Sequence, residues 1–249
     1  NAKDEWAYEL LRSIQRIFMN QSFVCTNVQF FLLSLSNLKK NTMLLARRIW
    51  NWCRRFRYRC GYGVHSPSDF FLITSVVYED LPYYAYDRLK SSSGLKTLPH
   101  YREKVNRLLF RLVNYFRPAS LIEVGEGNGD SYRYIREART SMTSVSLKGE
   151  DKEETLRLLK KELDKVKRLD FLHIAHTPYY KDVFEMAYPY LHAQSCVIVG
   201  HIYDSKEQET WWSQLLSDER VRISFDLYDI GLLLFEEKRF KQNYKVNFF

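Results

Sequence analysis

The second half of the chain alternates between short apolar runs and longer stretches with helical periodicity. The short runs predict strands, and the periodic stretches predict helices between them. The predicted strands are residues 120–124, 143–147, 170–175, 195–199, 221–228 and 231–236. The predicted helices are residues 130–139, 151–167, 180–191 and 205–216. This alternation indicates an α/β fold with a mostly parallel sheet and helices on both faces.

The last two predicted strands differ from the others in how they are connected. Only Asp229 and Ile230 separate them, which leaves no room for a crossover helix. Such a short connection joins antiparallel neighbours. We therefore expect a C-terminal hairpin that places one antiparallel strand in an otherwise parallel sheet.

The first part of the chain is predicted to be helical. Apolar residues recur at three- and four-residue spacing in residues 5–19 and again in residues 43–58, and a further helix is expected to start near Ser68. A serine- and glycine-rich loop at residues 91–94 then indicates a boundary. The pattern predicts a helical extension over residues 1–98 and an α/β domain over residues 99–249, which opens with a helix that ends before Pro118.

The basic charge is concentrated in one segment. The chain has a formal net charge of +8, and residues 39–59 contain Lys and Arg but neither Asp nor Glu. Trp50 and Trp52 lie among these cations, a combination that favours an anionic membrane surface over the phosphates of nucleic acid. A solvated helix face, packed on the domain through its aromatic residues, is an equally good interpretation.

Cellular location and membrane insertion follow from the cysteines and the hydropathy. The four cysteines show neither a disulfide framework nor a zinc pattern, so a reducing cytoplasm is expected. The longest nearly apolar stretch, residues 23–35, is shorter than the roughly 20 residues that span a bilayer. We expect no transmembrane helix. Any contact with a membrane is expected to be peripheral and to involve residues 39–59.

A glycine motif directly follows the first predicted strand. It reads Glu-Val-Gly-Glu-Gly-Asn-Gly over residues 123–129 and leads into a helix whose first residues, Asp130 and Ser131, are typical of a helix start. Glycines at the carboxyl end of a strand let the backbone turn sharply and approach a ligand. The spacing Gly-x-Gly-x-Gly is not that of a dinucleotide pyrophosphate loop. The acid at Glu123 favours the cationic end of a ligand over a phosphate.

With this motif, the series of strands and helices and the terminal hairpin, the chain resembles the class I S-adenosylmethionine-dependent methyltransferases from about Pro99 onward. The segment 197–203, with residues 205–207, Trp211 and Trp212, is similar to one small-molecule group of them. The resemblance implies a Rossmann-like methyltransferase sheet with S-adenosylmethionine as the cofactor. It further implies that the cofactor lies on the glycine loop and that the motif acid helps to hold the methionine amino group. The cofactor-binding residues implied are Glu123, Gly125, Gly127, Asn128, Gly129 and Ser131.

The chain departs from the family pattern at several strand ends. No acid closes the second strand as the family pattern implies, since only Glu150 is near and it comes late. The acids expected after the next two strands are replaced by Ala175 and by Gly200-His201. No carboxylate pair for a divalent cation is left there. Between residues 147 and 170 there is room for only one helix, so one strand at the sheet edge is expected to be missing, which leaves the adenine side of the pocket open.

Histidines supply the candidate catalytic groups. His65, His176 and His201 lie near predicted element ends, and His176 and His201 are candidates for a proton acceptor or a metal cluster. No pair of them has ligand spacing on one element, so solvated or hydrogen-bonded histidines and no metal are expected. The predicted function is methyl transfer to a small-molecule acceptor. The alternatives are a non-catalytic binding module with this fold and a peripheral membrane protein that acts through its basic helix.

Overall fold

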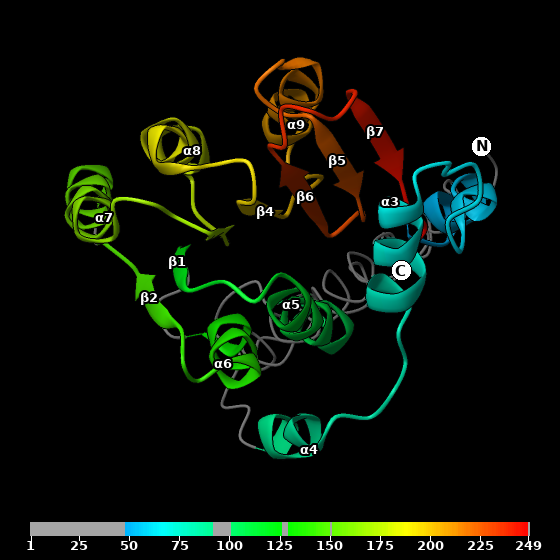
Figure 1. Ribbon diagram of the computed structural model, residues 1–249, viewed down its shortest axis with the longest axis horizontal. Coiled ribbons are helices and arrows are strands. Elements are labelled where there is room, and N and C mark those ends of the chain that lie inside the picture. Colours follow the sequence, from blue (N-terminus) through cyan, green and yellow to red (C-terminus); the bar gives the residue numbers. More distant parts are fainter. Residues whose placement is uncertain (1–47, 92–100, 126–128, 150, 249) are drawn as a thin grey trace, which may run out of the picture. The chain divides into compact units, whose positions relative to one another are not determined.

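The computed structural model of the protein describes residues 48–91, 101–125, 129–149 and 151–248 (Figure 1). The chain forms two compact units, Asn1–Cys53 and Arg54–Phe249. In the first unit the described residues, 48–53, are helical. The predicted helix at residues 5–19, and residues 39–47 of the basic segment, lie outside the described residues. The membrane or nucleic-acid contact proposed for that segment stays a prediction.

The second unit is built on a seven-stranded sheet with the order β2-β1-β3-β4-β6-β5-β7. The strands are β1 (Ser120–Val124), β2 (Thr143–Leu147), β3 (Phe171–Ile174), β4 (Cys196–Gly200), β5 (Ile223–Asp226), β6 (Ile230–Leu234) and β7 (Gln242–Lys245). The neighbours β2, β1, β3 and β4 are parallel, whereas β6 is antiparallel to both β4 and β5. The predicted Rossmann-like methyltransferase sheet with a C-terminal hairpin is confirmed.

Helices cover both faces of this sheet. Figure 1 shows α5 and α6 on one face and α7, α8 and α9 on the other. Their bounds are α5 (Glu103–Phe116), α6 (Asp130–Ala138), α7 (Lys152–Val166), α8 (Tyr180–Ala187) and α9 (Lys206–Ser217). Side-chain caps start two of them, since Asp151 accepts from the N–H of Glu154 and Ser205 accepts from that of Gln208.

The alternation of side chains along each strand divides the core into two layers. Leu121 and Phe171 point to the layer of α5, while Ile122 and Leu172 point to the layer of α7 and α8. Successive strand residues face opposite sides of a sheet, so a strand covered by helices on both faces is apolar throughout. This explains why continuous apolar runs located β1, β3 and β4 in the sequence.

The second unit begins well before the glycine motif. It contains the 3-10 turn η1 (Phe56–Tyr58), the helix α3 (Pro67–Leu72), the π-helix η2 (Ile73–Val77) and the helix α4 (Tyr84–Ser91). Leu72 and Ile73 are buried in the same core layer as Leu108 of α5. The boundary expected near residue 98 therefore falls inside this unit, because these helices complete one face of its core.

The two edges of the sheet differ from what the family resemblance implies. In the described part of the chain, β2 pairs only with β1, and α7 alone connects β2 to β3. At the opposite edge, the polar strand β7 pairs with β5. The expected loss of an edge strand beside β2 is confirmed, whereas the sequence pattern did not predict β7.

None of the helices in the described residues combines the length and the apolar character that crossing a bilayer requires. The stretch 23–35, on which the expectation of no transmembrane helix rests, lies outside the described residues.

Candidate functional site

The glycine motif lies where the carboxyl ends of β1, β2, β3 and β4 meet. Gly125 follows β1 with a φ of +133°, and a side chain there would place its Cβ 2.9 Å from the carbonyl oxygen of His176. Only glycine adopts this conformation without strain. Gly129 then provides the N-cap of α6. Gly127 and Asn128 lie outside the described residues, and their contact with a cofactor stays a prediction.

A row of polar residues crosses three strands just inside these ends. Glu123 is paired in register with Ser146 of β2 and with His173 of β3, and all three side chains face the α5 and α6 layer. Each is the last residue but one of its strand. Neighbouring parallel strands therefore bring these three residues side by side inside the protein.

The carboxylate of Glu123 is the centre of this row. It is fully buried and accepts hydrogen bonds from Ser131 Oγ at 3.1 Å, from Ser146 Oγ at 3.1 Å and from His173 Nδ1 at 2.7 Å. Several donors are what a buried carboxylate needs, because its desolvation is otherwise costly. The structure therefore places Glu123 and Ser131 behind the glycine turn. Their predicted contact with a cofactor remains a prediction.

Tyr101 extends the row towards β4. Its hydroxyl lies 3.2 Å from His173 Nε2. Since a carboxylate only accepts, His173 Nδ1 carries the proton, and Tyr101 is the donor to Nε2 when the imidazole is neutral. The same hydroxyl fills the space over Gly200, where any Cβ would overlap it. Glu123, His173 and Tyr101 thus form a continuous buried chain of hydrogen bonds.

His201 lies beside this chain, directly after β4. Its backbone is left-handed with a φ of +56°, and its N–H donates to the carbonyl of Asp229 at 2.8 Å. The ring stacks on Tyr101 with a centroid separation of 4.7 Å and an interplanar angle of 11°. His201 Nδ1 lies 2.9 Å from Asp204 Oδ2. The imidazole is therefore held on one face by Tyr101 and at one nitrogen by Asp204.

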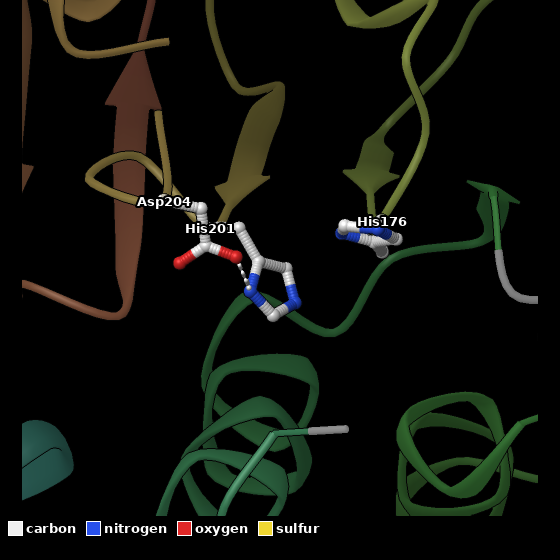
Figure 2. Close-up of side chains that lie close together, drawn as sticks. All are labelled: His176, His201 and Asp204. Atoms are coloured by element: carbon white, nitrogen blue, oxygen red, sulfur yellow. Dashed lines mark ion pairs between the residues drawn. The ribbon is translucent and has the colours of Figure 1, made fainter. Parts of the chain in front are cut away.

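His176 approaches from the neighbouring strand end. It follows β3 by two residues, is exposed, and its ring lies perpendicular to that of His201 at 5.1 Å between centroids. Figure 2 shows His176, His201 and Asp204 together. One ligand atom of each lies within 4.8 Å of the others. The structure therefore brings together the two predicted candidates, His176 and His201, while His65 is not part of the cluster.

A buried ion pair supports the loop that carries His201 and Asp204. Arg55 contacts both carboxylate oxygens of Asp226 at 2.8 Å, and Tyr203 donates to the same carboxylate at 2.6 Å. The Arg55 guanidinium also packs over the rings of Tyr203 and Tyr228. Burial, followed by the charge of Asp226, raises the pKa of the Tyr203 phenol above its ordinary value. Sequence reasoning did not identify this ion pair, because Arg55 and Asp226 are distant in the chain.

A cavity of about 290 Å³ lies elsewhere in the second unit, between residues 77–81 and the first turns of α5. None of the strand-end residues lines it. Its basic wall residues are partnered within the protein: Arg107 pairs with Glu103, and Arg111 donates to the carbonyls of Val76 and Val77. This cavity therefore has no part in the chemistry considered for the strand ends.

Comparison with known proteins gives likenesses of fold. No model of a known protein family matches the chain, and no curated protein matches it. Among solved structures, a putative caffeoyl-CoA O-methyltransferase from Staphylococcus aureus has 13% sequence identity and a TM-score of 0.47, covering 61% of this chain and 92% of its own. An SAH-bound methyltransferase from Podospora anserina has 13% identity and a TM-score of 0.43, covering 66% of this chain and 99% of its own.

A third solved structure, an O-methyltransferase from Bacillus cereus in complex with SAH, has 13% identity and a TM-score of 0.44, covering 64% of this chain and 95% of its own. TM-scores below 0.5 at such identities carry no argument about activity. The strand order and directions of the protein itself carry the assignment to the Rossmann-like methyltransferase fold.

Proposed function

We propose that the protein is an S-adenosylmethionine-dependent methyltransferase that acts on a small acceptor. The observation that carries the proposal is the turn at Gly125, which joins the end of β1 to α6 at the carboxyl edge of a sheet with the methyltransferase strand order. Ligands of open α/β sheets bind at this edge. The proposal does not depend on the identity of the acceptor.

The backbone of the site fits the cofactor better than the acidic side chains do. The glycine turn allows close approach of a ligand, and the N-terminus of α6 follows it. The Glu123 carboxylate, in contrast, is buried and engaged by three protein donors. We therefore assign the contact with the methionine part to the backbone at Gly125 and Gly129, the two described ends of the glycine turn. Glu123 and Ser131 hold that turn in place from behind.

Catalysis in this proposal is mainly positioning. When bound, the cofactor supplies an electrophilic methyl group on a sulfonium. The acceptor, an oxygen or nitrogen nucleophile, lies on the side of His176 and His201. One of these imidazoles takes the proton that the acceptor loses. Tyr101 and Asp204 keep the His201 ring in one orientation for this task.

A non-catalytic binding module with this fold is the second candidate, and two observations favour it. The two residues directly after β2 are Lys148 and Gly149, so no carboxylate stands at the strand end, where the family's usual acceptor for ribose hydroxyls is expected; the next acid in the sequence is Glu150. The edge at β2 also lacks a further strand in the described part of the chain. A module of this kind has the same sheet but does not bind the nucleoside.

Calorimetric titration of the full chain with S-adenosylmethionine and with S-adenosylhomocysteine separates the two candidates. The methyltransferase proposal predicts saturable binding of both at one site per chain. Absence of binding at millimolar ligand would refute it and leave the non-catalytic module.

One variant tests whether the ligand binds at the glycine turn. Gly129 has a φ of −68°, which any residue adopts, so Gly129→Ala adds a methyl group to the loop without backbone strain. We expect the variant to fold and to bind at least tenfold more weakly. Arg136→Ala, at the exposed far end of α6, is the matched control and keeps wild-type affinity. Equal binding by all three proteins would place the ligand elsewhere.

A further inference from the structure

The group formed by His176, His201 and Asp204 has a chemistry that the methyltransferase proposal does not require. His176 follows β3, while His201 and Asp204 belong to the turn after β4. Because β3 and β4 are parallel neighbours, their carboxyl ends bring the two imidazoles together from separate elements. Because the ligands come from two separate strand ends, their spacing along the sequence does not resemble that of a metal site on one element.

The His201 ring is preorganised for an additional partner. Asp204 accepts from its Nδ1 at 2.9 Å, and Tyr101 stacks on its face. Its Nε2 is buried and has no hydrogen-bond partner among the described residues. A histidine that ligates a metal characteristically donates its other ring N–H to a carboxylate, which fixes the tautomer and the ring orientation. The contact between His201 and Asp204 has this form.

The donor set differs from the carboxylates that hold magnesium or calcium. These hard cations prefer oxygen ligands, whereas imidazole nitrogens suit zinc, cobalt, nickel and copper. The strand ends offer Ala175 and Gly200 where the family resemblance implies acids, and two imidazoles lie beside them. The residues present therefore do not fit a hard cation and do fit a transition metal.

We propose that the protein binds one divalent transition-metal ion of the zinc class between His201 Nε2 and a ring nitrogen of His176. Asp204 orients His201 and offsets part of the charge of the ion. Zinc accepts nitrogen ligands at about 2.0–2.1 Å in a tetrahedral arrangement. The remaining coordination positions face the exposed side of His176 and take water or an oxygen or nitrogen donor of a small molecule. This site does not depend on S-adenosylmethionine. An imidazole whose lone pair ligates the ion does not accept a proton, so metal binding and the proton transfer proposed above are alternative uses of these two histidines.

The test is a titration of the tag-free chain with Zn²⁺, measured by calorimetry. A parallel titration with Co²⁺, measured by its visible absorption, reports on the ligands at the same site. Cys25, Cys53 and Cys60 are replaced by serine beforehand, because thiols also bind zinc. We expect one Zn²⁺ per chain, with no displacement by millimolar Mg²⁺. Absence of stoichiometric binding, or displacement by Mg²⁺, would overturn the proposal.

Three variants in this background locate the ion. His176→Ala removes an exposed ring, and His201→Asn keeps a residue that tolerates a left-handed backbone. Each is expected to bind zinc at least thirtyfold more weakly. Asp204→Asn leaves the metal ligands in place, and its affinity for zinc is expected to fall about 10–100-fold. His65→Ala removes an imidazole outside the cluster and keeps the parent affinity.

Circular dichroism shows which variants keep the fold. If His201→Asn does not fold, His176→Ala decides the question alone, since its side chain is exposed. Zinc binding by His176→Ala with the affinity of the parent protein would overturn the proposal. Because these measurements contain no nucleoside, their failure is distinguishable from a failure of the methyltransferase proposal.

Discussion

Replacement of Arg55 by methionine tests the buried ion pair between Arg55 and Asp226, which supports the loop after β4. The side chains of Arg55 and Asp226 are 11% and 3% exposed, and two contacts of 2.8 Å join them. Methionine fills a similar volume but leaves the Asp226 carboxylate buried without its cation. Removing one member of a buried ion pair costs about 3–5 kcal/mol. We expect Arg55→Met to lower the free energy of unfolding by that amount.

Urea unfolding, followed by circular dichroism, measures this loss. Arg54→Met is the matched control, because Arg54 is the neighbouring arginine and is exposed. It removes the same charge and should change the free energy of unfolding by no more than about 0.5 kcal/mol. A loss below about 1 kcal/mol for Arg55→Met would show that the pair contributes little more than a surface ion pair.

A double-mutant cycle with Asp226→Asn then isolates the interaction. In the wild-type background, Asp226→Asn removes the charge that Arg55 compensates and is expected to destabilise. In the Arg55→Met background, the same change removes an uncompensated buried charge and should cost little. The expected coupling free energy is about 1–3 kcal/mol. Additive effects of the two substitutions would refute the reasoning.

Three further predictions concern the strand ends and the fold. Tyr101→Phe keeps the ring but removes the hydroxyl that hydrogen-bonds to His173, and should lower the free energy of urea unfolding by about 1–2 kcal/mol. Gly125→Ala forces a Cβ into a backbone with a φ of +133° and should cost about 1–3 kcal/mol, seen as a lower melting temperature. Burial raises the pKa of Asp170, but hydrogen bonds from His192 and two backbone N–H groups outweigh it and leave the pKa below the ordinary 3.8. Asp170 therefore stabilises the folded state above pH 3.8 and loses that effect as the pH falls further, so acid unfolding of Asp170→Asn should depend less on pH in that range.

Each of these three predictions has a result that contradicts it. An unchanged free energy of unfolding for Tyr101→Phe would mean that the hydroxyl exchanges one partner for another without cost. A wild-type melting temperature for Gly125→Ala would show that the turn relaxes. For Asp170→Asn, an acid unfolding curve parallel to that of the wild type would assign the acid sensitivity to other carboxyl groups.

The sequence predicted the parallel strands well, because their environment is the simplest. Strands β1 and β2 have the predicted bounds, 120–124 and 143–147, and β3 and β4 each differ from their predicted bounds by one residue at both ends. In β1, β3 and β4, burial on both faces requires a nearly continuous apolar run, which a sequence displays directly. The polar strand β7 has no such pattern. It exists because β5 offers it a ladder of hydrogen bonds, which local sequence does not record.

Apart from the two candidate histidines, His176 and His201, the candidate site was predicted where its residues are local in sequence. The glycine turn is one continuous motif, and the structure places Gly125 and Gly129 at the end of β1 and the start of α6. The contact of Tyr101 with His173 spans 72 residues, and that of Arg55 with Asp226 spans 171. Contacts of this kind depend on strand order and register. One signal was present, namely a polar residue in the last position but one of three successive strands.

Hydrogen–deuterium exchange with and without S-adenosylhomocysteine tests the central claim most directly, because it reports where on the chain a ligand acts. The account predicts slower amide exchange in peptides that cover residues 124–131 when the ligand is saturating, with no comparable change along β7 at the opposite edge of the sheet. Unchanged exchange at residues 124–131 in the presence of millimolar ligand would contradict the assignment of the glycine turn as the cofactor site.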